Sequence, residues 1–290
     1  WWQQTRQKGE APAGGMVVTA NQNVVPPGSQ HFLGAEWTLP YRHDRIRERL
    51  AARERHDVAS FASIQSDVVS RSVLELMPAL RGANPSTPAG RAALAMLRDW
   101  RGQMAADAAE PLIATAWIDR LRRLVFEDEV GESLFPLLER QRVRNRALLH
   151  ALTRVDHAHW CDDVRTPAVE ACGPLVDRAL DEAVRDLAAR YGDDPSAWRW
   201  GRAHEAVSEH RPFSKVAPLA RIFEIRVPSP GDAQTVNVGR HNPWDAAEPF
   251  ANRWAASLRA IYDMSNPDAS RFIHSTGQSG HVLSPHYRDL

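Results

Sequence analysis

Ser275-Thr276-Gly277-Gln278-Ser279-Gly280-His281-Val282-Leu283-Ser284-Pro285-His286-Tyr287, near the end of the chain, is the stretch that says most about how the chain folds. It combines small hydroxyl residues and glycines with imidazole and phenol rings. Glycine, serine and proline favour tight turns, and the rings and hydroxyls supply hydrogen-bonding groups. The composition predicts a compact turn beside a polar pocket.

Two more segments precede it at a distance. They read Val17-Val18-Thr19-Ala20-Asn21-Gln22-Asn23 and Trp198-Arg199-Trp200-Gly201-Arg202-Ala203-His204. In this order and at about this separation, the three segments resemble the large subunit of the penicillin acylases, amidohydrolases of the N-terminal-nucleophile class. The resemblance covers nearly the whole chain. Shorter matching pieces are Phe32–Trp37, Tyr41–Ile46, Gly231-Asp232 with Thr235-Val236, and Tyr262-Asp263.

The resemblance implies an α/β fold. It implies part of the αββα sandwich of N-terminal-nucleophile hydrolases, with a large helical excursion in the middle of the chain. We expect residues 1–290 to form part of one large-subunit domain, divided into a strand and loop segment (1–40), a mainly helical segment (41–192) and a strand-rich return to the sheet (193–290). We also expect the chain to be an interior fragment, because the family pattern continues in both directions.

The hydrophobic pattern predicts where the helices and strands lie. Apolar residues recur at helical spacing from Val58, after an N-cap at Asp57, to Leu76. Further helices are predicted over 91–104, 111–126, 134–154 and 175–191, the last of them ended by Gly192. Strands are predicted at 17–19, at Trp198 and Trp200, and over 222–227, 235–238 and 271–274, and these could complete one sheet.

The charge balance argues against a nucleic-acid or membrane partner. Lys plus Arg equals Asp plus Glu at 36 each, so no overall field attracts a polyanion. The Arg-rich piece 41–55 alternates with acidic residues, as in a solvated helix face. No apolar run is long enough to span a bilayer, and no stretch of the sequence has the charged start and apolar core of a signal peptide. The resemblance implies a periplasmic or secreted protein.

Cys161 and Cys172 are the only cysteines. A pair this sparse excludes a disulfide scaffold and a four-cysteine zinc site. The spacing suits one loop-closing disulfide in an oxidising compartment and two buried thiols in a reducing one.

The catalytic residues follow from the resemblance. The family uses a subunit N-terminal Ser as nucleophile and its α-amino group as base. Trp1 has no nucleophilic atom, so this Ser is expected upstream, and the chain alone is expected to be inactive. Asn21 aligns with the asparagine whose amide stabilises the oxyanion. A turn asparagine is the alternative, and Asn23 is a second candidate if the register differs by two residues.

Arg45 aligns with the family arginine that lies beside the nucleophile and the oxyanion asparagine. The alternative is an ordinary solvated arginine, because Arg42, Arg47 and Arg49 lie close by in the sequence. Glu36 lies near the position where relatives supply a carboxylate to a structural calcium, and a surface acid is equally compatible. No cofactor is implied for the chemistry itself.

The histidines carry no metal-site signature. Neither His204 with His210 nor His274 with His281 and His286 has the helical spacing of a zinc hydrolase. Instead, Gln278, Ser279, His286 and Tyr287 are expected to support the loops around the active-site cleft. Ser279 lies outside a nucleophile elbow, which argues against a Ser-His-Asp triad.

The sequence therefore predicts a fragment of a zymogen-processed amidase that deacylates a β-lactam or a related N-acylated small molecule. Its implied partners are the small subunit and the preceding part of the large subunit. The competing hypothesis is a noncatalytic, tryptophan-rich binding module, suggested by the ten Trp residues of the chain.

Overall fold

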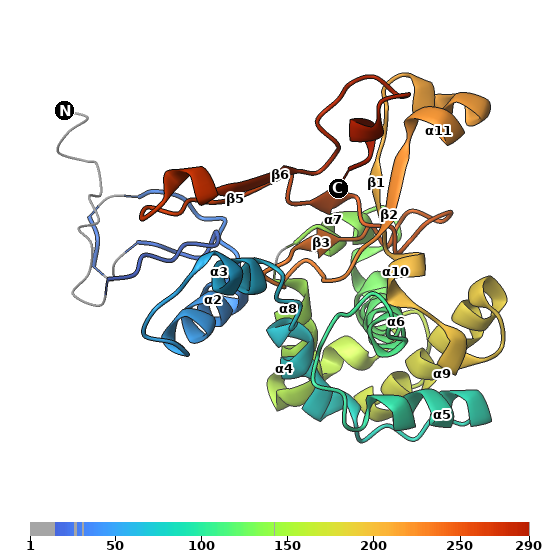
Figure 1. The fold of residues 1–290 in the computed structure, drawn as a ribbon. Helices are drawn as coiled ribbons and strands as arrows, with labels where there is room; N and C mark the ends of the chain where they lie inside the picture. Colours follow the sequence, from blue (N-terminus) through green and yellow to red (C-terminus); the bar gives the residue numbers. More distant parts are fainter. Residues whose placement is uncertain (1–14, 26–27, 31, 142, 290) are drawn as a thin grey trace.

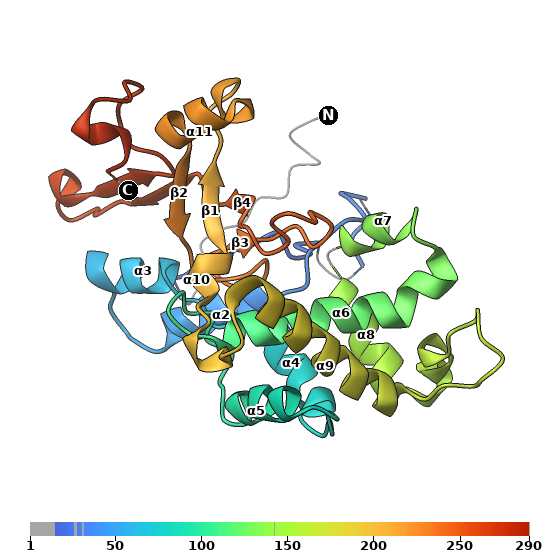
Figure 2. The same ribbon diagram turned by 90° about the vertical axis from the view of Figure 1, so that its right-hand side faces the viewer.

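The computed structural model describes residues 15–25, 28–30, 32–141 and 143–289. Most helices gather at one end of the molecule, and the short paired strands lie toward the other (Figures 1 and 2). The α-helices are α2 (Tyr41–Ala51), α3 (Val58–Gln65), α4 (Arg71–Leu80), α5 (Pro88–Leu97), α6 (Glu110–Val130), α7 (Phe135–Glu139), α8 (Arg144–Thr153), α9 (Cys172–Tyr191), α10 (Trp200–Ala203) and α11 (Ala217–Phe223). Among the described residues, none of these helices is long and apolar enough to cross a membrane.

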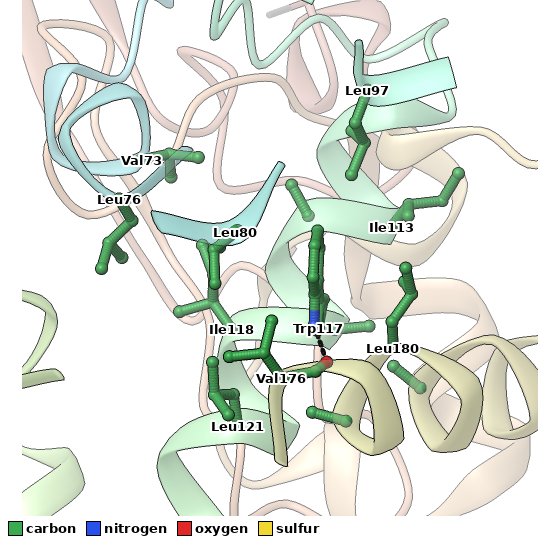
Figure 3. Packing of buried hydrophobic residues seen from close by; sticks show 14 of the residues in the cluster. Val73, Leu76, Leu80, Leu97, Ile113, Trp117, Ile118, Leu121, Val176 and Leu180 are labelled. Carbon is green, nitrogen blue, oxygen red and sulfur yellow. Dashed lines mark hydrogen bonds between the residues drawn. The ribbon is translucent and has the colours of Figure 1, made fainter. Parts of the chain in front are cut away.

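Helix α6 is the centre of the hydrophobic core. It packs along α9, and its Trp117 is fully buried and donates a hydrogen bond from Nε1 to the Val176 carbonyl oxygen of α9 at 2.9 Å (Figure 3). Leu80 of α4 and Leu97 of α5 are also fully buried in this cluster. Burial of large apolar side chains is the main stabilising contribution here. The helical middle of the chain is thus a packed unit with its own core.

Capping residues set the helix starts. The Asp57 side chain accepts a hydrogen bond from the Ser60 backbone N–H at 2.7 Å, and the Asp57 backbone N–H donates one to the Ser60 hydroxyl at 2.9 Å, which completes a capping box for α3. Ser70 caps α4, and Thr87 caps α5 immediately before Pro88. The predicted N-cap at Asp57 is confirmed. So is the end of α9 at Gly192, which has φ 94°.

Two helices predicted as continuous are interrupted. The expected helix from Val58 to Leu76 breaks because the β-branched pair Val68-Val69 is extended and pairs with the chain at Gln103. The helix expected over 134–154 divides into α7 and α8, and Arg144 at the start of α8 donates a hydrogen bond to the Glu139 carbonyl oxygen. The helix expected over 91–104 ends at Leu97, since the following residues form the partner of the Val68 segment.

The strands form three separate antiparallel pairs. They are β1 (Glu205–Ser208) with β2 (Ile225–Pro228), β3 (Gly239–Arg240) with β4 (Trp254–Ala255), and β5 (Leu258–Ile261) with β6 (Arg271–His274). The registers include Ala206 opposite Val227 and Ala260 opposite Phe272. The described residues therefore form a mixed α/β structure with small sheets, and the single sheet expected from the sequence is not formed among them. A third segment meets β1 only through an isolated parallel bridge between Ala206 and Asn252, two residues before β4.

Several expected strands adopt other structures. Residues 17–19 are not in a strand, and the nearest ladder is an isolated parallel bridge between Gln22 and Thr38. Residues 235–238 form a turn in which the buried Thr235 hydroxyl donates to the Asn237 carbonyl oxygen at 2.7 Å. The expected strand over 222–227 begins only at Ile225, because Phe223 ends α11. The strand at 271–274 is confirmed as β6.

Among the described tryptophans, Trp100, Trp117, Trp198 and Trp200 are buried, whereas Trp254 is exposed. Trp198 and Trp200 were expected in strands, but Trp200 begins α10 and both side chains are buried. Their indole nitrogens donate hydrogen bonds to the Gly192 and Gly231 carbonyl oxygens at 2.8 and 3.0 Å. Aromatic residues favour strands only when a half-buried sheet surface is available, and here the core of the helical region takes them instead. This burial weakens the hypothesis of a tryptophan-rich interaction module.

The two cysteines form a disulfide. Cys161 ends the 3₁₀ helix Val155–Cys161, and Cys172 begins α9, with the two Cα atoms 5.0 Å apart. The bond closes the loop that joins the α8 end of the core to α9. Of the two alternatives left open by the sequence, the structure contains the disulfide and not two free thiols.

Candidate active site

A cavity of about 230 Å³ lies where the Asn21 segment meets the helical region and the loop before β3. Most of the residues that line it are polar or charged. It is lined by Asn21, Thr38, Arg42, Ser72, Val73, Thr115, Ile118, Asp119, Arg122, Arg140, Gln141, Arg144, Asn145, Asp232, Ala233, Gln234, Val238, Arg240, His241 and Trp254. Segments that are far apart in the sequence therefore meet at one site.

Asn21 lies on this cavity and is held by two neighbours. Its backbone has φ 65°, a left-handed conformation that asparagine tolerates better than most residues. Its carbonyl oxygen accepts a hydrogen bond from the Thr38 backbone at 2.9 Å, and its Oδ1 accepts one from Arg42 Nη2 at 2.8 Å. No described residue accepts a hydrogen bond from its Nδ2, so the amide remains available as a donor.

The second candidate, Asn23, is exposed, as Asn21 is, but does not line this cavity. Its Oδ1 accepts a hydrogen bond from the Val25 backbone at 2.8 Å, which forms a local turn around the side chain. As at Asn21, the carboxamide oxygen is occupied and no described residue pairs with the amide group. Both side chains could therefore donate a hydrogen bond from the amide nitrogen to an oxyanion. Of the two, only Asn21 lines the cavity.

Arg45 does not contact Asn21. Its guanidinium binds Asp67, with Nε 3.0 Å from Oδ1 and Nη2 2.6 Å from Oδ2, and its Nη1 reaches Glu48 at 2.8 Å. The hydrogen bonds to Asp67 raise the pKa of Arg45 above its ordinary value. The arginine beside Asn21 is Arg42, one helical turn earlier on α2. Both arginines were considered from the sequence, but which of them reaches Asn21 depends on how α2 is oriented in the fold.

A buried charge cluster forms another part of the cavity wall. Arg122 of α6 is 1% exposed and binds Glu139 through two hydrogen bonds of 2.6 and 2.8 Å. It also donates to Asp119 and, at 2.9 Å, to Asn145 Oδ1. Burial alone would lower the pKa of Arg122, but the two carboxylates raise it above its ordinary value. Arg122 is therefore a fixed cation whose charge is compensated from two sides.

His241 completes this wall. Its Nε2 lies 2.8 Å from Asp119 Oδ2, its side chain is 6% exposed, and its Nδ1 is buried without a hydrogen-bond partner among the described residues. Burial would raise the pKa of Asp119, but the charges of His241 and Arg122 outweigh this and hold it below the ordinary range. An ionised Asp119 accepts a hydrogen bond from the N–H at His241 Nε2, which leaves Nδ1 as the ring nitrogen without a described partner.

Arg144 supplies a second, less compensated cation. Its Nε is 3.9 Å from Glu139 Oε2, a carboxylate already bound by Arg122. Burial lowers the pKa of Arg144 to about 10, and the neighbouring charge of Arg122 contributes to this shift. Two guanidinium groups thus share one carboxylate beside the cavity.

A second cavity of about 690 Å³ adjoins the first. Arg140, Gln141, Arg240, His241 and Trp254 line both. The Arg140 guanidinium lies over the Trp244 ring, 5.3 Å from its centroid, and Trp254 is 72% exposed at the shared rim. Together the two cavities form a cleft with aromatic and cationic walls.

Glu36 is an exposed residue on the second cavity. Across 15–25, 28–30, 32–141 and 143–289, no three His, Cys, Asp or Glu side chains come together in a way that suits a metal ion. Glu36 therefore belongs to no such group among the described residues, and its calcium role stays a prediction that depends on ligands from elsewhere.

The loop at 275–287 folds back on itself, as its composition predicts. Ser279 N donates to the His286 carbonyl oxygen at 2.9 Å, and the Tyr287 hydroxyl donates to the Phe223 carbonyl oxygen at 2.6 Å. Gln278, Ser279 and Tyr287 line a separate cavity of about 340 Å³ together with His210. The loop therefore lies beside a polar pocket, but not the one that contains Asn21.

Comparison with known proteins identifies the class. A sequence profile described as penicillin amidase matches residues 7–290, so the chain belongs to the penicillin amidase family. A solved structure of a thermostable penicillin G acylase from Alcaligenes faecalis has a similar fold, with a TM-score of 0.53 and 17% identity over 96% of this chain and 52% of that one.

Curated relatives include two kinds of acylase. An acyl-homoserine lactone acylase QuiP of Pseudomonas syringae pv. syringae is 28% identical over 95% of this chain, and a QuiP of Pseudomonas aeruginosa is 28% identical over 96%. A penicillin acylase 2 proenzyme of Pseudomonas sp. strain SE83 is 29% identical over 96%. The chain spans about a third of the length of these relatives, between 35% and 36%.

Proposed function

We propose that the protein containing this chain hydrolyses the linear amide bond of an N-acylated small molecule. An acyl-enzyme forms on an N-terminal serine from outside these residues, and that serine's α-amino group accepts the proton of its hydroxyl. Family membership supports this, as do relatives named penicillin acylase and acyl-homoserine lactone acylase. The chain described here contributes supporting groups.

Asn21 is the proposed oxyanion donor. The observation that carries this is the hydrogen bond from Arg42 to Asn21 Oδ1 at 2.8 Å, on the wall of the cavity. Because Oδ1 is occupied by a cationic donor, the carboxamide is oriented with its Nδ2 hydrogens free. A neutral donor held in place before the reaction stabilises a developing oxyanion without reorganisation. Arg42 is therefore a positioning residue, and Arg45 holds α2 in place through Asp67.

The test compares two matched variants of the complete, processed enzyme. Asn21→Ala should reduce kcat about 10²- to 10³-fold, because one oxyanion donor is lost, while the far-ultraviolet circular dichroism stays that of the parent. Asn23→Ala should change kcat only slightly. The reverse pattern would transfer the donor role to Asn23, and unchanged turnover in both variants would refute a role for this segment.

The remaining features of the proposal concern the whole enzyme. A small subunit and the preceding part of the large subunit, released by zymogen processing, complete the active site. A structural calcium binds Glu36 together with oxygen ligands from outside these residues. The protein is periplasmic or secreted, and the Cys161–Cys172 disulfide supports this, because disulfides persist in oxidising compartments.

A further inference from the structure

Helix α2 carries Arg42, whose Nη2 donates the 2.8 Å hydrogen bond to Asn21 Oδ1. Where that guanidinium points depends on how α2 is rotated about its own axis. A surface helix is usually held in one rotation by an apolar stripe packed on the core. Of the 11 residues of α2, all of them described, only Tyr41 is buried, and Pro40 provides no side-chain cap at the helix start. Polar contacts must therefore fix the rotation of this helix.

Polar anchors take the place of the apolar stripe. Tyr41, Arg45 and Glu48 follow one another at helical spacing and so lie on one side of α2. Arg45 binds Asp67, whose side chain is only 6% exposed, and Glu48 binds Arg71 at the start of α4. The side chains of the second pair are exposed, so this ion pair contributes little. The more buried anchors are thus Arg45 and, at the very start of the helix, Tyr41.

The hydroxyl of Tyr41 makes two hydrogen bonds, and they go to two different helices. It donates to Glu75 Oε2 of α4 and accepts from Arg146 Nη2 of α8 at 3.1 Å. Arg146 also binds Glu75, with Nη2 2.8 Å from Oε1, so the three side chains contact one another in a closed triangle. Burial, together with the hydrogen bond to Glu75, raises the pKa of Tyr41 to about 12. The hydroxyl therefore stays protonated and remains a donor at neutral pH.

Helices α4 and α8 also form part of the cavity wall. They pack against each other (Figure 1), and they supply Ser72 from α4 and Arg144 and Asn145 from α8. Asn145 Nδ2 donates a hydrogen bond to Ser72 Oγ at 3.0 Å, which ties the two helices together at the cavity. Tyr41 itself does not line the cavity. Its hydroxyl joins α2 to the two helices that shape this part of the wall.

We infer that Tyr41 is a positioning residue for the proposed oxyanion donor. Its hydroxyl fixes the rotation of α2 against α4 and α8, that rotation aims Arg42, and Arg42 orients the Asn21 carboxamide. The inference rests on the proposed function. Because an oxyanion exists only during the reaction, loss of the Tyr41 hydroxyl should lower the rate of reaction rather than the affinity for the substrate.

The first experiment removes only the hydroxyl. In the complete, processed enzyme, Tyr41→Phe keeps the ring and leaves the ion pair between Arg146 and Glu75 in place, so the variant should fold. We expect kcat to fall about tenfold and KM to change less than about twofold, because Asn21 is still present but is oriented less often. An unchanged kcat, or a rise in KM that accounts for the whole loss of kcat/KM, would overturn the inference.

A double-mutant cycle tests whether Tyr41 acts through Asn21. In the Asn21→Ala background the donor is already absent, so adding Tyr41→Phe should lower kcat by less than about twofold. If the hydroxyl only stabilised the fold, it would lower kcat by the same factor in both backgrounds. That result would overturn the inference.

Tyr191→Phe is the matched control. It makes the same chemical change at the end of α9, where the ring packs against the hydrophobic core and does not line the cavity. Its kcat should stay within about twofold of that of the parent. A loss as large as that of Tyr41→Phe would overturn the inference, because a hydroxyl far from α2 would then have the same effect.

Hydrogen exchange separates this inference from the amidase proposal, because it needs no turnover. The Thr38 N–H donates to the Asn21 carbonyl oxygen at 2.9 Å and so reports on the segment that α2 orients. Tyr41→Phe should raise the exchange rate of this amide at least about fivefold while exchange in α6 stays unchanged, and Tyr191→Phe should leave both unchanged.

The outcomes of the two measurements are distinct. Unchanged exchange at Thr38 in Tyr41→Phe would overturn the inference whether or not the enzyme is an amidase. Full turnover in Asn21→Ala would instead refute the oxyanion role of Asn21, and a raised exchange rate at Thr38 would then still show that Tyr41 orients this segment.

Discussion

Asp119 Oδ2 and His241 Nε2 lie 2.8 Å apart, and they join the first half of α6 to the turn that follows β3. The same carboxylate binds Arg122, which in turn holds Glu139 at the end of α7. Three segments distant in the sequence are therefore tied by one buried network beside the candidate site. Removing one member of such a network is costly, because the charged groups that remain are buried and have neither their partner nor water to solvate them.

Glu139→Gln should destabilise the protein by about 3–5 kcal/mol, because Arg122 is left buried with only half of its charge partners. Urea denaturation of the full-length protein, followed by tryptophan fluorescence, measures this change. Glu127→Gln is the control, since its partner Arg123 is exposed, and the loss there should stay below about 1 kcal/mol. Equal losses in the two variants would contradict the buried network.

His204 should make stability depend on pH between about 6.5 and about 3. Burial, together with the charge of His241, lowers the pKa of His204 to about 3, and its ring stacks on Trp200 with centroids 4.1 Å apart. The unfolded chain binds a proton below its ordinary pKa and the folded chain does not, so stability is full above that value. It falls by up to about 1.4 kcal/mol per pH unit as the pH decreases.

Free energies of unfolding measured at several pH values check this. His204→Phe keeps an aromatic ring on Trp200 but cannot titrate, so its stability curve should be flatter than that of the parent over the same interval. Parallel curves would show that His204 contributes no titration.

Gly231→Ala should destabilise the protein more than Gly192→Ala. Both glycines have positive φ, 86° and 94°, so both alanines are strained by about 1–3 kcal/mol. At Gly231 an added Cβ would also fall on the Asn237 carbonyl oxygen, whereas at Gly192 it would meet nothing within 4 Å. Thermal unfolding of the two variants should differ by a further cost of about 1–3 kcal/mol.

Replacing both cysteines by serine should lower the free energy of unfolding by about 2–4 kcal/mol, because the bond between Cys161 and Cys172 restricts the unfolded chain. Unfolding with and without a reductant provides the check. The reductant should lower the stability of the parent toward that of the double variant and leave the double variant unchanged. If the reductant lowered the stability of both proteins equally, its effect would not come from this disulfide, and the prediction would be contradicted.

The sequence predicted the elements that local chemistry determines. The capping box at Asp57, the glycine stop at Gly192 and the turn-rich loop at 275–287 depend on neighbouring residues, and they appear where the sequence placed them. The breaks between α3 and α4 and between α7 and α8 depend on partners distant in the chain. Val68 pairs near Gln103, and Arg144 returns to Glu139, and neither contact is visible from helical periodicity.

The candidate site was predictable only in part. The family pattern pointed to Asn21, and the structure places Asn21 on a cavity. Asp119, Arg122 and His241 were not singled out, because their importance arises from burial and mutual contact rather than from spacing. The one available signal was the position of His241 between two predicted strands, in a loop rich in polar residues, and that signal is weak on its own.

The segment that contains Asn21 is attached to the rest of the protein by few contacts. Its hydrogen bonds run to Thr38 and Arg42, whereas α6 lies within a continuous apolar core. Regions with few buried apolar contacts open at lower free energy than the global transition. On heating, catalysis should accordingly fail before the helices melt, so a residual-activity curve and a circular dichroism curve of the same enzyme would have separate midpoints.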